Sequence, residues 1–479
     1  MRAPVVILGG GLTGLSAAWH LDDVPSVVLE RDDEPGGLCR TSVEEGFTFD
    51  CTGHLLHLRD PRFRELVERL APGVFASHER RALIYSKGTF TPYPFQANLA
   101  GLPLETVKEC VGGFVDALVR REKAGDPDPE RATFREWVEA IFGAGIAKHF
   151  MLPYNAKLWR VDLDEIECGW VSWSIPRPTL REVLDGAFGT TVSGLGYNPT
   201  FLYPRAGGIR ALPDAFAARV PDVRTKHAVE AIDARRRVVR LRGGAEIPYE
   251  RLVSTMPLDR LLATTEGLPD ELPLVGKRLR SVRVLNICLG VARRRLSNAH
   301  WVYFPEPEFS FYRIGFPSNL APGLAPRGCS SVWAERSLLA DEPFDPADVT
   351  ARAVDDLQRA GILGRRDRIV FSRVGVLDPA YVLYDRHRAR HLPRVLETLR
   401  EHGIDSTGRF GAWEYSSMEG AMRAGADAAE RARAALGAAT QSGALGAAAL
   451  GASGRAVQGG ADGPPAGRAA TASRRRRVA

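Results

Sequence analysis

Glycines spaced for contact with a phosphate open the chain. The motif has the order G-x-G-x-x-G, and its candidate binding residues are Gly9, Gly11, Leu12, Thr13 and Gly14. It follows an apolar run at 5–8 and precedes small residues at 16–18. In such a motif the first glycine makes a tight turn, the second lets the backbone approach a pyrophosphate, and the third lets a helix pack closely on a strand. Because a helix N-terminus attracts anions, the spacing predicts a dinucleotide-binding site.

An acidic residue strengthens this prediction. Glu30 ends the second apolar run, roughly 20 residues after the first glycine, where a carboxylate can accept hydrogen bonds from the ribose hydroxyls of an adenosine. The alternative is a glycine turn with an incidental surface glutamate. The combination of strand, glycine spacing and acid favours the nucleotide site.

A second glycine pair follows the carboxylate. The candidate cofactor-binding residues here are Arg31, Gly36, Gly37, Leu38 and Arg40. Segment 34–41 resembles the one that lies along the pyrophosphate in flavoproteins of the amine oxidase and protoporphyrinogen oxidase type, where the residues that match Arg40 and Thr41 face phosphate. That resemblance implies FAD, since a nicotinamide dehydrogenase normally lacks this segment. A solvated arginine after a turn is the alternative for Arg40.

Three further segments combine aromatic and polar side chains. They contain Tyr93 and Gln96 in 91–99, Asn155 and Trp159 in 153–159, and Tyr303 and Arg313 in 301–313. Asn155 and Trp159 are one helical turn apart and therefore share a face. Arg313 stands among aromatics on an expected strand, where a guanidinium needs an anion. Each cluster alone is also typical of core packing, but the three together indicate a ligand site.

The elements that must position these residues follow from periodicity. The start of the chain predicts a βαβ unit. Beyond it we expect helices in 102–159, strands with a two-glycine hairpin in 223–256, strands in 283–374 with a helix near 351–360, and a last helix at 419–436.

Length and composition set bounds on the whole protein. The chain has 479 residues, too many for one hydrophobic core, so we expect two or three structural units. Hydrophobic residues make up 44% and charged residues 25%, as in globular proteins, and no apolar run reaches the length of a membrane span. No leader pattern precedes 5–8, so we expect a cytoplasmic protein. The six cysteines form no C-x-x-C pair, and we expect no metal site.

The end of the chain differs in composition from the rest. From 437 onward it is almost all Ala, Gly, Ser, Pro and Arg, so we expect a disordered tail in 437–479. An arginine run at 474–477 supplies much of the net charge of +6. Without interleaved aromatics, the run favours a solvated tail over a nucleic-acid partner.

Four strings along the chain occur in an order typical of one family. They are Tyr-Pro-Phe-Gln at 93–96, Pro-Tyr-Asn-x-Lys-x-Trp at 153–159, Tyr-Phe-Pro-Glu at 303–306 followed by Phe-Tyr-Arg at 311–313, and Gly-Arg-Phe-Gly-x-Trp-x-Tyr at 408–415. From Pro4 to about Leu436, the chain resembles the UDP-galactopyranose mutases, specifically their eukaryotic-type branch.

The resemblance implies an α/β fold with three domains. These are a Rossmann-type FAD-binding domain in 1–100, 200–265 and 400–436, a mainly helical insertion domain in 101–199, and an antiparallel β-sheet domain in 266–399. The last two bind substrate.

The resemblance also implies a role for each matching residue. Tyr93 and Gln96 hold the uracil end of a nucleotide sugar, and Asn155 and Trp159 line the same pocket. Arg313 clamps the diphosphate, to which Tyr381 and Tyr415 donate hydroxyls, and His54 lies on a flap beside the flavin. Asn198 and Tyr303 are further candidates for substrate binding. Val229, Arg409 and Met418 complete the candidates for cofactor binding.

The resemblance implies a reaction that interconverts the pyranose and furanose forms of a nucleotide sugar without net redox, in which reduced flavin N5 attacks the anomeric carbon.

 The expected substrate is UDP-linked, and the expected reductant is NAD(P)H or another donor. Oligomeric state stays open.

The sequence departs from this family at one important position. Where the family carries a second diphosphate arginine, this chain has Ser174. Either Arg177 reaches the same phosphate, or the substrate differs in its nucleotide or sugar. In the flap, Thr52 precedes Gly53, so this chain has one glycine where the family has a pair. The segment after Tyr415 is also shorter than in the eukaryotic enzymes.

Two other classes of function remain open. One is an FAD-dependent oxidase or dehydrogenase of the amine oxidase or protoporphyrinogen oxidase type, which shares the FAD-binding domain but needs no diphosphate clamp. The other is a nucleotide-sugar binder without catalysis, which the complete set of glycines and Glu30 disfavours.

Overall fold

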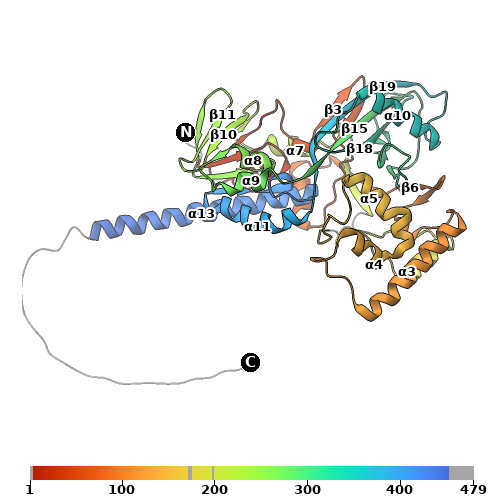
Figure 1. Cartoon of the computed structure of the whole chain (residues 1–479). Helices are drawn as coiled ribbons and strands as arrows, with labels where there is room; N and C mark the ends of the chain where they lie inside the picture. Colours follow the sequence, from red (N-terminus) through yellow and green to blue (C-terminus); the bar gives the residue numbers. More distant parts are fainter. Residues whose placement is uncertain (1–3, 171–174, 197–198, 453–479) are drawn as a thin grey trace, which may run out of the picture. The chain divides into compact units, whose positions relative to one another are not determined.

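The computed structural model describes residues 4–170, 175–196 and 199–452 (Figure 1). Residues Met1–Arg433 form one compact unit and Ala434–Ala479 a second. The candidate site residues that the structure describes all belong to the first unit. Ser174 and Asn198 lie outside the described residues.

A five-stranded parallel sheet carries the glycine-rich turn. Its order is β20 (Ile404–Ser406), β13 (Arg251–Ser254), β1 (Val5–Leu8), β2 (Ser26–Leu29) and β9 (Val223–Arg224), and helix α1 (Leu12–His20) connects β1 to β2. Every residue of β1 is buried, as expected for an apolar strand in the middle of a parallel sheet. The predicted βαβ opening and the Rossmann-type fold are confirmed.

Three smaller sheets are also present in the described part of the chain. One has the order β12 (Glu246–Pro248), β11 (Val238–Leu241), β10 (Val229–Asp233) and β14 (Thr265–Glu266). The others pair β3 (Thr41–Glu44) with β4 (Phe47–Asp50), and β5 (Phe75–Glu79) with β8 (Thr200–Pro204). Gly243 and Gly244, in the predicted hairpin turn between β11 and β12, both have a positive φ.

A seven-stranded sheet forms the β-rich part of the molecule. Its order is β19 (Ile369–Val382), β15 (Ser281–Val291), β18 (Ser330–Leu338), β17 (Arg313–Gly315), β16 (Trp301–Tyr303), β6 (Ala82–Ser86) and β7 (Thr89–Pro92). The pairs are antiparallel except β16 with β6, which is parallel, so one pair departs from the predicted arrangement. Strands β6 and β7 complete this sheet although they come from the range predicted for the FAD-binding domain.

Helices dominate the segment between β7 and β8. They are α3 (Leu104–Ala124), α4 (Phe134–Ile146), a π-helical turn η3 (Ala147–Met151), α5 (Leu152–Trp159) and α6 (Leu180–Ala187). Thr133 begins α4 with a reciprocal capping box to Glu136. Helices α3 and α4 approach closely at Gly145, where a Cβ would stand 2.0 Å from the carbonyl oxygen of Glu109. The predicted helical region is therefore present.

The remaining elements include eight more helices among the described residues. They are α2 (Pro61–Leu70), α7 (Ala211–Ala217), α8 (Leu258–Thr264), α9 (Glu271–Gly276), α10 (Pro346–Arg359), α11 (Arg386–Glu401), α12 (Gly408–Gly411) and α13 (Met418–Ala452), with 3-10 turns η1 (Gly37–Cys39), η2 (Phe95–Ala97) and η4 (Pro317–Asn319). Helix α13 continues past 437, where we expected the tail to begin, because its sequence is rich in alanine, the best helix former. Within the described residues, no helix is long and apolar enough to cross a membrane.

Candidate active site

The glycine turn after β1 has the geometry that its sequence predicts. Gly9 has a φ of +100°, which side chains other than glycine rarely adopt. A Cβ on Gly14 would stand 2.0 Å from the carbonyl oxygen of Gly9, so the start of α1 packs directly on the turn. The N-terminus of α1 has no side-chain cap and no acidic residue in its first turn. Its backbone N–H groups therefore suit an anionic ligand.

The two glycine pairs lie against each other. Gly11 and Gly36 form a parallel bridge, and a Cβ on Gly37 would stand 3.0 Å from the Cα of Gly11. A Cβ on Gly11 would meet nothing closer than the Cα of Gly37, at 3.8 Å. Gly11 therefore borders open space that a pyrophosphate can approach.

The candidate ribose carboxylate is buried beside this turn. Glu30 is 7% exposed, and its Oε2 accepts a hydrogen bond from the Gly10 N–H at 2.7 Å. Just before β10, the backbone N–H of His227 donates to the Glu30 carbonyl at 2.8 Å, which brings the start of that strand, Val229, near the same end of the sheet.

The two arginines of this region lie differently. Arg40 donates from Nη1 to Asp32 at 2.8 Å and from Nε to the Gly37 carbonyl at 3.0 Å, so it spans the second glycine pair. The Arg31 side chain is 62% exposed and is 3.6 Å from Asp32. Arg40 thus lies along the second glycine pair while Arg31 faces solvent, and the contact of either residue with a cofactor stays a prediction.

One cavity of about 180 Å³ brings together segments far apart in the sequence. Eight of the predicted site residues line it: Leu38, His54, Tyr303, Arg313, Tyr381, Arg409, Tyr415 and Met418. Two guanidinium groups and three phenols thus face one space, and the described lining residues include no carboxylate. Such a lining attracts an anion with several oxygen acceptors.

Arg313 is held by a buried acid across the sheet. The register of β17 and β18 sets Arg313 opposite Glu335, and its Nε and Nη2 donate to one Glu335 oxygen at 3.0 and 2.7 Å. Burial alone would lower the pKa of Arg313, but the Glu335 carboxylate keeps that pKa well above its usual value. Both contacts use the Nε–Nη2 side of the guanidinium, which leaves Nη1 for a further acceptor.

A tryptophan fixes the other side of this arginine. The guanidinium carbon of Arg313 is 5.4 Å from the centre of the Trp333 ring. The ring packs against two glycines, since a Cβ on Gly53 would be 2.7 Å from it and a Cβ on Gly315 only 2.1 Å. Gly53 precedes His54, so this packing positions the flap beside the arginine.

Arg409 connects the tyrosines to the glycine turn. Its guanidinium carbon is 5.2 Å from the Tyr381 ring centre and 5.0 Å from that of Tyr415, and these two rings stack at 6.1 Å. The preceding Gly408 has a positive φ, and a Cβ there would stand 2.6 Å from the Thr13 hydroxyl oxygen. Close packing of α12 on α1 therefore sets the distance between the tyrosine pair and the candidate cofactor site.

The residues of the expected uracil end lie next to this cavity. The Tyr93 ring is 5.4 Å from that of Tyr303, and the Trp159 ring is 5.8 Å from that of Tyr381. Trp159 Nε1 donates to the Asn155 Oδ1 at 3.1 Å, so these two residues support each other one turn apart on α5. Their roles in binding a base stay predictions.

Gln96 contacts the segment that contains Arg177, shortly after position 174, where the family carries an arginine. Gln96 is buried, and its Nε2 donates to the Pro176 carbonyl at 2.7 Å. The neighbouring Arg177 pairs with Asp126 at 2.9 Å and lies over the Trp137 ring, 5.3 Å from its centre. Arg177 is not among the residues that line the cavity. Its proposed contact with phosphate stays a prediction, as does the contact of Asn198 with the sugar.

Sequence reasoning missed several residues of this site. Glu335 and Trp333 contact Arg313 directly, Tyr154 packs edge-on against Tyr303, and His300 lines the cavity. Glu335 had a weak signal, because it is a carboxylate that directly follows the apolar residues 332–334. Its pairing with Arg313 depends on strand register, which the sequence alone does not define.

Burial keeps two of the three histidines that line the cavity, His54 and His300, neutral. Burial, with the nearby Arg409 and Arg313 charges, lowers the pKa of His54 to about 4. Burial, together with Arg81 and His78, lowers the pKa of His300 to about 3. Both side chains therefore act as neutral imidazoles near pH 7.

The low pKa of His300 predicts a loss of stability in acid. Between the unfolded-state pKa of about 6.5 and the folded value of about 3, only the unfolded chain binds this proton, so the free energy of unfolding falls as pH falls. His300→Asn should lose less stability between pH 7 and 4.5 than the wild type, by on the order of 1 to 2 kcal/mol. Urea unfolding at both pH values measures this difference. Equal pH dependence of the two proteins would contradict it.

The fold and the site together define a nucleotide-binding enzyme with a Rossmann-type domain. Residues 12–433 match the model of the flavin containing amine oxidoreductases, and the chain belongs to that family. Its cofactor is therefore FAD, which fits the open glycine turn, the uncapped start of α1 and the buried Glu30.

Three proteins are similar to this chain over very different lengths. A crystal structure of a reduced UDP-galactopyranose mutase is 28% identical, with a TM-score of 0.85, and the match covers 92% of this chain and 95% of that one. Polyamine oxidase 2 of Arabidopsis thaliana is 23% identical over 321 residues, 64% of this chain and 61% of that protein. An inactive all-trans-retinol 13,14-reductase of Danio rerio is 47% identical over 49 residues, 10% of this chain and 8% of that protein. The chain spans less than two thirds of the length of either of these two curated relatives.

Proposed function

We propose that this flavoenzyme is a mutase that interconverts the pyranose and furanose forms of a UDP-linked sugar, related to the eukaryotic-type UDP-galactopyranose mutases. The observation that supports this proposal most strongly is the first cavity. Arg313, Arg409 and three tyrosines line it, and its described lining residues include no carboxylate. Guanidinium and phenol donors match the oxygens of a diphosphate. The structural similarity to a mutase across 92% of the chain supports the same conclusion.

Arg313 is the proposed diphosphate clamp. Glu335 and Trp333 fix its side chain before substrate binds, so little conformational entropy is lost when the phosphate arrives. Tyr381 and Tyr415 stack beside it, and burial raises the pKa of Tyr381 to about 12. Tyr381 therefore keeps its proton at neutral pH and donates a hydrogen bond to a phosphate oxygen.

When bound and reduced, FAD would supply a nucleophilic nitrogen for the anomeric carbon, with NAD(P)H or another donor as the source of its electrons. The protein holds the departing nucleoside diphosphate at Arg313 so that it can return to the same sugar. The neutral His54, held near Arg313 by the Gly53–Trp333 packing, lines the cavity without adding a charge. These contributions are orientation and electrostatic stabilisation.

An amine oxidase function is the second candidate, because the family and the Arabidopsis polyamine oxidase include such activity. A protonated amine would approach two guanidinium groups in this cavity and find no carboxylate among its described lining residues. The repulsion disfavours that substrate class.

A binding panel distinguishes the two candidates. We expect UDP and UDP-galactose to bind the FAD-loaded protein, while putrescine and spermine do not, as measured by calorimetry. Binding of the amines, with release of peroxide and without binding of UDP, would favour the oxidase.

A further inference from the structure

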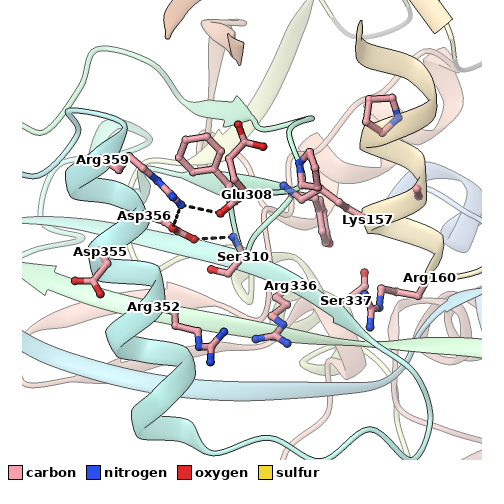
Figure 2. Close-up of a pocket in the computed structure, with 15 residues that line it drawn as sticks. Lys157, Arg160, Glu308, Ser310, Arg336, Ser337, Arg352, Asp355, Asp356 and Arg359 are labelled. Atoms are coloured by element: carbon pink, nitrogen blue, oxygen red, sulfur yellow. Dashed lines mark hydrogen bonds and ion pairs between the residues drawn. The ribbon is translucent and has the colours of Figure 1, made fainter. Parts of the chain in front are cut away.

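A second cavity lies on the other side of α5 from the Asn155–Trp159 pair. It is lined by residues of α5, the segment 307–312, β18 and α10, and its volume is about 730 Å³ (Figure 2). Small-molecule pockets commonly have volumes of about 300 to 1,000 Å³. None of its described lining residues belongs to the first cavity, so it is a separate space.

Three arginines, Arg160, Arg336 and Arg352, lie along one side of this cavity (Figure 2). Arg160 pairs with one oxygen of Glu342 at 2.9 Å, while Arg336 is 3.6 Å from the other oxygen of the same carboxylate. Two guanidinium groups thus share one acid, and Arg336 lacks a short contact to it. Arg352, on α10, pairs with Asp348 at 3.1 Å and is 64% exposed. A phosphate with several oxygens suits such forked donors.

Neutral and cationic donors add to the same cavity. Lys157 donates from Nζ to the carbonyls of Phe304 and Glu306, both at 2.8 Å, which leaves its third hydrogen for a ligand. Burial lowers the pKa of Lys157 to about 7, so a bound anion would favour its charged form. The hydroxyls of Ser310 and Ser337 have no hydrogen-bond partner among the described residues, and rotation about Cα–Cβ can redirect them.

The opposite side of the cavity holds the carboxylates of Glu308 and Asp356 together with the guanidinium of Arg359. In Figure 2, Arg352, Arg336, Ser337 and Arg160 lie along one side, and Glu308 and Asp356 lie across from them. Asp356 is engaged by Arg359 and by the Ser310 N–H, at 2.6 Å in the latter contact. Glu308 makes no ion pair among the described contacts and can accept hydrogen bonds from hydroxyl groups. The cavity therefore suits a ligand with a phosphate at one end and hydroxyls at the other.

We propose that this second cavity binds a sugar phosphate. Arg336 and Arg352 hold the phosphate, Lys157 adds a donor, and Glu308 accepts from the sugar hydroxyls. The proposal does not depend on the reaction at the flavin, because the two cavities share no described lining residue.

Calorimetry on the FAD-loaded full chain tests this proposal with galactose 1-phosphate as the probe. We expect binding that weakens at least tenfold in Arg352→Ala, whose side chain is exposed and can be removed without disturbing the core. Arg336→Lys, which keeps the charge but loses the fork, should weaken binding too. Arg365→Ala, an exposed arginine just beyond α10, is the matched control and should bind like the wild type. Arg313→Ala, in the first cavity, should also leave this affinity unchanged.

Three results would overturn the proposal. The first is no binding of galactose 1-phosphate by the wild type. The second is a loss of binding in Arg313→Ala with none in Arg352→Ala, which would place the ligand in the first cavity. The third is equal affinity for inorganic phosphate and galactose 1-phosphate, which would mean that the cavity holds an anion without recognising a sugar.

Discussion

Replacing Arg313 with alanine should weaken the binding of UDP and of UDP-galactose by about 2 to 5 kcal/mol, or roughly 30-fold or more. The substitution removes the forked donor from the cavity and leaves Glu335 buried, 0% exposed, without its partner. The remaining carboxylate would then repel the diphosphate. Calorimetric titration of the FAD-loaded variant gives the affinity directly.

Two companion variants separate this effect from a general loss of structure. Arg313→Lys keeps the charge near Glu335 but loses the planar fork, so we expect an intermediate affinity. Arg177→Ala removes an arginine that pairs with Asp126 outside the cavity lining. A loss equal to that of Arg313→Ala, and non-additive with it, would show that Arg177 replaces the arginine absent at Ser174. Unchanged UDP affinity in a folded, FAD-loaded Arg313→Ala would refute the clamp.

Replacing Gly11 with valine should abolish FAD binding while the protein still folds. In the structure a Cβ at Gly11 has no neighbour within 3.8 Å, so the substitution meets little steric resistance from the protein itself. The added side chain would instead occupy the space through which the pyrophosphate approaches the backbone. The flavin absorbance of the purified protein, relative to its absorbance at 280 nm, measures the retained cofactor.

Gly112→Val is the matched control for this prediction. Gly112 lies on α3, and a Cβ there meets nothing within 4 Å. We expect this variant to retain FAD. A Gly11→Val protein with normal flavin content would contradict the assignment of the pyrophosphate to this turn.

The sequence predicted best those features that depend on short segments. The turn around Gly9 and Gly14 has the expected conformation because its glycines meet within one strand–turn–helix unit. The position of Glu30 follows from the same unit. Local rules of backbone sterics suffice to predict such sites.

Features that depend on distant segments were harder to predict. Arg313 was recognisable as a cation that needs an anion, but Glu335 became its partner only through the register of β17 and β18. The parallel pairing of β6 with β16 joins segments more than 200 positions apart, which no periodicity encodes. At the end of the chain a local rule was misapplied. Composition suggested disorder from 437 onward, but the same alanine-rich sequence favours a helix, and α13 continues to Ala452.

The most direct test of the proposed function is to follow UDP-galactopyranose and UDP-galactofuranose by chromatography with the FAD-loaded protein under anaerobic conditions. We predict interconversion after reduction with dithionite or NAD(P)H, no interconversion by the oxidised protein, and no net consumption of reductant. Absence of interconversion by the fully reduced protein, with both sugars tested as substrates, would contradict the mutase assignment.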